Sequence, residues 1–120
     1  MAVTAFRRPE AFEPFFEARS EHEGDAVRVL LFGEFDLAAA PLLEQECRRV
    51  EELGSRIVAF DLNGLTFMDA SGLRAVLASQ VRAQENGRPP PLVNAGGVVR
   101  RLFDLTGNGG LLDLDPSLHS

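Results

Sequence analysis

The most informative segment of the sequence is RIVAFDLNGLTFMDASGLRAVL, residues 56–77, in which an apolar run is followed by a polar turn and a helix. Its first part, Arg56–Leu62, is mostly apolar over the length of one strand. Such runs are typical of strands that are covered on both faces or paired in parallel. Asn63-Gly64 is expected to turn the chain, and residues 65–68 are expected to lead back into the core.

The polar run Asp69-Ala70-Ser71-Gly72 stands where the next helix begins, and its apolar spacing predicts a helix that ends near residues 86–87. Ser71 is open to two interpretations. It is a helix N-cap, a role that Asp69 fills equally well, or it is a site of covalent modification at the positive end of the helix. Arg74 stands where a capping box would place Glu or Gln, so no capping box forms around Ser71.

The segments on the N-terminal side predict a hairpin and an amphipathic helix. Residues 1–11 are expected to be a loose lead-in, followed by weak strand signals at 15–19, a turn at 21–25 and a strand at 27–33. Pro41 suits the first turn of a helix that Gly54 ends. The apolar positions of that helix are Leu43, Cys47, Val50 and Leu53, and the intervening charged residues, Glu46 among them, form its solvated face.

The segments on the C-terminal side predict one more strand and one more helix. The prolines 89–91 lack ladder donors, so only a short strand fits at 92–95. Gly96-Gly97 then opens a third helix, which stops at residues 106–110, and a last strand turn is expected at 111–114. The apolar positions of the second helix are Leu73, Val76, Leu77 and Val81, and those of the third are Val98, Val99, Leu102, Phe103 and Leu105.

The order β-β-α-β-α-β-α requires crossover connections, so part of the sheet is expected to be parallel. The sequence therefore predicts an α/β fold with a mixed sheet. A chain of 120 residues fits a single domain. We place the boundaries at a lead-in of residues 1–12, a domain of residues 13–114 and a tail of residues 115–120.

Composition excludes several classes of function. The net charge of −6 disfavours direct nucleic-acid binding, which needs a basic face. The single cysteine permits no internal disulfide and indicates a reducing compartment. No apolar run reaches the roughly 20 residues of a membrane span. The first residues lack the apolar core of a secretory signal, so we expect a cytoplasmic protein.

The residues also argue against catalysis and metal binding. Ser71 is not part of a G-x-S-x-G motif, and the two histidines, His22 and His119, fall in a turn and in the tail. One cysteine and two distant histidines give no metal-ligand spacing. Residues 106–110 are glycine-rich but lack the Gly-Lys-Ser/Thr ending of a P-loop. We therefore expect no enzyme activity, no metal and no cofactor.

Three segments together carry a family resemblance: VRVLLFGEFDLAAAPLLEQ (27–45), RIVAFDLNGLTFMDASGLRAVL (56–77) and VVRRLFDLTGNGGLL (98–112). In order and spacing they resemble the anti-sigma factor antagonists, which are stand-alone STAS domains. The middle segment is the most specific. The resemblance implies a single STAS-like α/β domain, with a mixed four- to five-stranded sheet and amphipathic helices packed largely on one face.

The resemblance also implies a function in bacterial transcription regulation by partner switching. The unphosphorylated protein would bind an anti-sigma factor that is also a serine kinase, and so release the sigma factor. Phosphorylation of Ser71 would end that binding, and a metal-dependent serine phosphatase would reset it. Asp36, Asp69, Gly72 and Arg74 are expected beside the phosphorylation site, in contact with the partner. Ala70 stands where relatives often have a second serine.

Two other functions remain open from the sequence. One is a STAS scaffold or adaptor in a stress-sensing complex, with the same fold but no sigma factor downstream. The other is a module that binds a small molecule or a nucleotide. The proline run at 89–91 departs from the usual strand entry of the family, which leaves the serine motif untouched.

Overall fold

The computed structural model describes residues 2–7 and 15–107. In chain order its elements are β1 (Ala2–Arg7), β2 (Phe16–Glu23), β3 (Ala26–Phe35), α1 (Ala40–Glu52), β4 (Arg56–Met68), α2 (Ala70–Glu85), β5 (Leu92–Asn94) and α3 (Gly97–Leu105). The predicted hairpin, the three helices and the short strand after the prolines are confirmed. The last strand turn expected at 111–114 lies outside the described residues.

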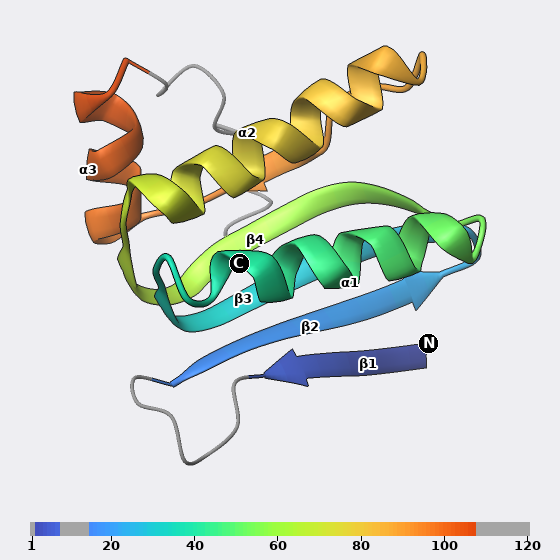
Figure 1. The fold of residues 1–120 in the computed structure, drawn as a ribbon, viewed down its shortest axis with the longest axis horizontal. Coiled ribbons are helices and arrows are strands. Elements are labelled where there is room, and N and C mark those ends of the chain that lie inside the picture. Colours follow the sequence, from blue (N-terminus) through green and yellow to red (C-terminus); the bar gives the residue numbers. More distant parts are fainter. Residues whose placement is uncertain (1, 8–14, 108–120) are drawn as a thin grey trace.

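The five strands form one mixed sheet in the order β1-β2-β3-β4-β5. The pairs β1–β2 and β2–β3 are antiparallel, whereas β3–β4 and β4–β5 are parallel. Parallel neighbours need a crossover, which α1 and α2 provide. Because β3 and β4 run in the same direction, their C-terminal ends meet at one edge of the sheet. That edge is where α1 and α2 begin (Figure 1).

Helices α1 and α2 pack beside each other over one face of the sheet, and α3 packs against β4 (Figure 1). The core between these layers is apolar and includes Val29, Leu31, Leu43, Phe60 and Val76. Alternate residues of β3, such as Val27, Val29 and Leu31, point into this core, as the period of a strand requires. The predicted α/β fold with a mixed sheet is thus confirmed.

Two predictions about the strands were wrong or incomplete. The chain does not turn at Asn63-Gly64, because β4 continues to Met68 and pairs Gly64 with Phe32. A Cβ on Gly64 would stand 2.7 Å from the carbonyl oxygen of Leu31, so glycine serves a close strand approach here. The second difference is β1, which pairs with β2 over residues 2–7, where the sequence indicated a loose lead-in.

Most of the apolar positions predicted for the helices are buried or half-buried, but some are exposed. Leu43, Cys47 and Val50 of α1 are buried as predicted, but Leu53, Val81 and Leu105 are exposed. Leu53 directly follows α1 and Leu105 is the last residue of α3, whereas Val81 lies within α2 beside the buried Ser79 and Gln80, on a side of the helix that faces away from the core.

Glu46 does not belong to the solvated face of α1. It is buried, accepts a hydrogen bond of 2.9 Å from the Ser20 hydroxyl of β2 and pairs with Arg49. A charged group is buried at low cost only when it is paired and hydrogen-bonded. This polar link therefore ties the helix layer to the sheet inside an otherwise apolar core.

Candidate functional site

The first turn of α2 is capped by Asp69. Its Oδ1 accepts hydrogen bonds from the backbone N–H groups of Ser71, at 2.9 Å, and Gly72, at 3.1 Å. These are two of the N–H groups that a helix leaves without an internal partner. Of the two residues that the sequence allowed as the cap, the structure selects Asp69, and the N-cap interpretation of Ser71 is wrong.

Ser71 is the second residue of α2, and its side chain is partly exposed. Its hydroxyl is not used for capping. The Nη2 of Arg74, one helical turn later, donates to Ser71 Oγ over 3.4 Å. Arg74 is exposed and forms no ion pair within the described part of the chain. The serine motif thus presents a hydroxyl and a guanidinium side by side.

Gly72 allows α2 to begin directly against the end of β3. A Cβ at this position would meet the ring and the carbonyl oxygen of Phe35, each at 2.8 Å. The same carbonyl accepts the N–H of Asp69 over 3.3 Å. The close approach of Phe35 therefore explains why a glycine stands at position 72, and Phe35 itself was not anticipated as a part of the site.

Asp36 follows Phe35 directly and organises the turn into α1. Its Oδ1 accepts the N–H of Ala39 at 3.0 Å, and its carbonyl accepts the N–H groups of Ala39 and Ala40. Because β3 and β4 are parallel neighbours, the loops that follow them lie together at one edge. The structure therefore brings Asp36 to the same end of the sheet as Asp69, Ser71, Gly72 and Arg74.

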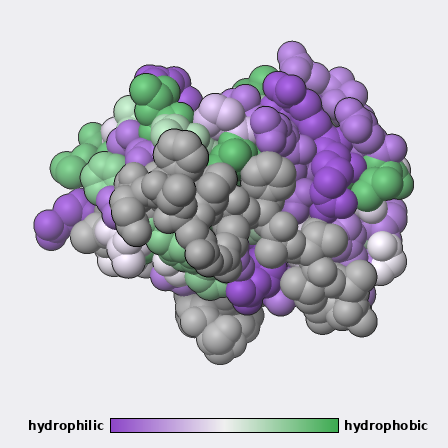
Figure 2. Space-filling view, turned by 60° about the horizontal axis from the view of Figure 1, so that its bottom comes forward, coloured by the Kyte–Doolittle hydropathy of each residue, from purple (hydrophilic) through white to green (hydrophobic). Residues whose placement is uncertain are grey.

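Exposed apolar side chains surround these polar groups. Phe15, Leu37 and Phe67 have exposed fractions of 48%, 71% and 45%, and each lies at a strand end or in a loop on this edge. Figure 2 shows hydrophobic surface gathered at the left of the view, the side on which α1 and α2 begin in Figure 1. The sequence placed Phe67 on the way into the core. The strand period corrects this, because the buried neighbour Met68 points to the opposite face.

Neither a cluster of metal-binding side chains nor a membrane-spanning helix is found in the part of the chain that is described. Residues 2–7 and 15–107 hold no group of three or more His, Cys, Asp or Glu placed to bind a metal ion. Among the same residues, no helix has the length and apolar character needed to cross a membrane. Around the start of α2 the structure presents a hydroxyl, two carboxylates, one guanidinium and an apolar rim.

Comparison with known proteins identifies the family. The model of the STAS domain family matches residues 17–120, so the chain belongs to that family. Among curated relatives, the anti-sigma-B factor antagonist of Bacillus subtilis (strain 168) is 28% identical over 94 residues, which are 78% of this chain and 84% of that protein. The protein of the same name from Staphylococcus aureus (strain NCTC 8325 / PS 47) is 24% identical over 83 residues, 69% of this chain and 77% of its own.

Solved structures agree with this fold. An anti-sigma factor antagonist from Mycobacterium paratuberculosis superposes with a TM-score of 0.66 at 26% identity, over 87% of this chain and 92% of its own. The anti-sigma factor antagonist SpoIIAA in its unphosphorylated form superposes with a TM-score of 0.65 at 24% identity, over 80% of this chain and 85% of its own.

Proposed function

We propose that this protein is an anti-sigma factor antagonist whose binding is switched off by phosphorylation of Ser71. In its unphosphorylated form it binds an anti-sigma factor with serine kinase activity and so releases the sigma factor. A metal-dependent serine phosphatase restores the binding form. The relatives named above support the antagonist role, and the geometry at the start of α2 supports the position of the switch.

The observation that carries the proposal is the partly exposed Ser71 hydroxyl at the rim of an apolar surface. Its Oγ takes no part in capping α2, because Asp69 caps the helix. A kinase can therefore modify Ser71 without removing a bond that holds the helix start. Phe67, near the end of β4, and Leu37, in the loop after β3, expose apolar area of the kind that partners bury.

The charge of a phosphate explains how one covalent event would end binding. A phosphoserine carries about −1.5 to −2 charges at pH 7. The N–H groups of Ser71 and Gly72 are already bonded to Asp69, so the phosphate gains little from the helix end, and Asp69 repels it. Burying this charge beside Phe67 under a partner costs several kcal/mol, an estimate that follows from ion desolvation. The fold itself need not change.

The test is a binding and phosphorylation assay with the anti-sigma factor of the same organism. We expect the kinase to modify wild-type protein at one serine, which mass spectrometry places at Ser71. Ser71→Ala should bind the anti-sigma factor and resist phosphorylation. Ser71→Asp should bind more weakly by about tenfold or more, as for a charge placed in an interface.

A matched control is Ser55, which is partly exposed like Ser71 but lies before β4, outside the proposed interface. Ser55→Ala should still be phosphorylated and Ser55→Asp should bind normally. Equal binding by wild type and Ser71→Asp would contradict the switch. Binding to an ATPase partner that controls no sigma factor would instead identify a STAS scaffold in another complex.

A further inference from the structure

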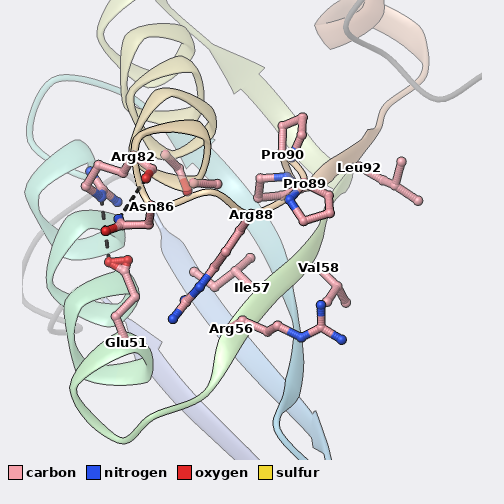
Figure 3. Close-up of a pocket in the computed structure, with 13 residues that line it drawn as sticks. Glu51, Arg56, Ile57, Val58, Arg82, Asn86, Arg88, Pro89, Pro90 and Leu92 are labelled. Carbon is pink, nitrogen blue, oxygen red and sulfur yellow. Dashed lines mark hydrogen bonds and ion pairs between the residues drawn. The ribbon is translucent and has the colours of Figure 1, made fainter.

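A cavity of about 370 Å³ lies at the other end of α2 from Ser71 (Figure 3). Its walls come from the last turns of α2, the end of α1, the start of β4 and the loop with the proline run. Arg82 follows Ser71 by eleven residues, which corresponds to roughly 16 Å along a helix. This cavity is therefore separate from the serine site, and its volume falls within the range of about 300–1,000 Å³ typical of ligand pockets.

The lining of this cavity has the opposite charge to the protein as a whole. It contains three arginines, Arg56, Arg82 and Arg88, and one glutamate, Glu51, so its formal charge is +2. The complete chain carries −6. A local surplus of cations in an acidic protein attracts an anion at this place rather than over the whole surface.

Two of the arginines have unused hydrogen-bonding capacity. The Nε–H of Arg82 is buried and has no hydrogen-bond acceptor among the described residues, although Glu51 Oε1 lies 3.6 Å away as an ion-pair partner. Arg88 is exposed and forms no ion pair within residues 15–107. Figure 3 shows Arg88 extending across the cavity towards the side where Arg82 and Glu51 lie. Arg56 lines the opposite side and pairs with Asp25 at 3.8 Å.

The remaining walls are apolar and rigid. Ile57, Val58 and Leu92 contribute aliphatic side chains, and Pro89–Pro91 restrict the backbone of the adjoining loop. The Gln80 side chain donates to the Pro91 carbonyl over 3.2 Å, which ties this loop to α2. The cavity thus combines a cationic side with a preformed apolar side, the usual layout of a small-molecule site.

We propose that this cavity binds an organic phosphate monoester, with its phosphate on Arg82 and Arg88 and its apolar body against Ile57, Val58 and Leu92. Guanidinium groups match phosphate oxygens in a bidentate way. Arg88 has no carboxylate partner among residues 15–107, and a phosphate monoester, which is mostly dianionic at pH 7, brings more negative charge to Arg82 and Arg88 than a single carboxylate does. This site does not depend on the function proposed for Ser71.

The experiment is a titration of the isotope-labelled full chain with phenyl phosphate, followed by NMR at constant ionic strength. We expect saturable shifts in the backbone amides of residues 79–88 and Leu92, and in the Arg88 Nε–H signal. Inorganic phosphate and benzoate serve as comparison ligands and should bind more weakly. Arg88→Gln and Arg82→Gln should each weaken phenyl phosphate binding by about tenfold or more, as for the loss of a charge-assisted hydrogen bond.

The matched control is Arg101→Gln, which removes one exposed arginine from α3 and makes the same change in net charge. It should bind within about twofold of wild type. The proposal would be overturned if Arg88→Gln and Arg101→Gln lost the same affinity for phenyl phosphate, or if the wild-type protein showed no saturable shift. Benzoate or inorganic phosphate binding as tightly as phenyl phosphate would also overturn it. If Arg82→Gln does not fold, as judged from its NMR spectrum, the test rests on Arg88→Gln, because Arg88 is exposed and its replacement should leave the fold intact.

Discussion

Phe35 lies so close to Gly72 that a methyl group on the glycine would stand 2.8 Å from both Cδ2 and the carbonyl oxygen of Phe35. The ring of Phe35 also stacks on Phe16, with centroids 5.3 Å apart. The start of α2 is therefore fixed against the end of β3, and the serine motif rests on a rigid part of the core.

We expect Gly72→Ala to destabilise the fold by about 1–3 kcal/mol, the usual cost of overpacking. The alanine would gain up to about 1 kcal/mol in helix propensity, which is too little to compensate. Urea unfolding measures the difference. Gly96→Ser is the control, because its φ of −136° suits any residue and a Cβ there meets only Asn63 Oδ1 at 3.4 Å. Equal stability of Gly72→Ala and wild type would contradict the close packing.

Two apolar residues of α2 should respond very differently to truncation. Leu73 is buried, so Leu73→Ala should cost about 2–5 kcal/mol in unfolding free energy. Val81 is 51% exposed on the same helix, so Val81→Ala should change stability by no more than about 0.5 kcal/mol. Thermal or urea unfolding compares the two. Similar losses in both variants would mean that α2 packs with another face inward.

Arg74 should stabilise the dianionic form of a phosphate on Ser71. Before modification, Arg74 Nη2 lies 3.4 Å from Ser71 Oγ. The backbone N–H groups of Ser71 and Gly72 are already bonded to Asp69. A nearby cation lowers the pKa of an acid. We therefore expect the second pKa of phosphoserine 71 to be lower in wild type than in Arg74→Gln, measured by ³¹P NMR titration. Arg101→Gln should match wild type, and identical pKa values in all three proteins would exclude a contact with Arg74.

Cys47 should make stability fall at high pH. Burial raises the pKa of its thiol from 9.0 to about 12, with desolvation as the largest cause. The unfolded chain releases this proton near pH 9 and the folded protein keeps it. The buried thiol therefore makes its full contribution to the unfolding free energy below pH 9, and this contribution is lost as pH rises towards 12.

The unfolding free energy of wild type, relative to Cys47→Ala, should therefore decline by about 1.4 kcal/mol per pH unit above pH 9. Guanidinium titrations at several pH values measure this difference. Parallel curves for the two proteins would show that the thiol ionises equally in both states.

Much of the fold could be read from local pattern. The patterns that predicted the elements involve only residues that are close in the sequence. They are the alternation of residues 27–33, the helical spacing of Leu43, Cys47 and Val50, and the glycines at turns. Gly24, Gly54 and Gly87 have φ values of 63°, 80° and 69°, as their turn and helix-end positions require. Contacts that join distant segments were harder. β1 forms because β2 supplies a partner for residues 2–7, and no pattern within residues 2–7 predicts that pairing.

For the site, local pattern was enough to place Ser71 at the start of a helix, with Asp69 and Gly72 beside it. The three-dimensional arrangement was needed to show that Asp69 is the cap, that Phe67 is exposed, and that Glu46 is buried against Ser20. Exposure and the burial of Glu46 depend on atoms brought from other elements, and the choice of cap depends on where α2 begins against the end of β3, where the Asp69 N–H donates to the Phe35 carbonyl. Spacing along the chain fixes a residue's own element, whereas its environment is set by the elements that pack against it.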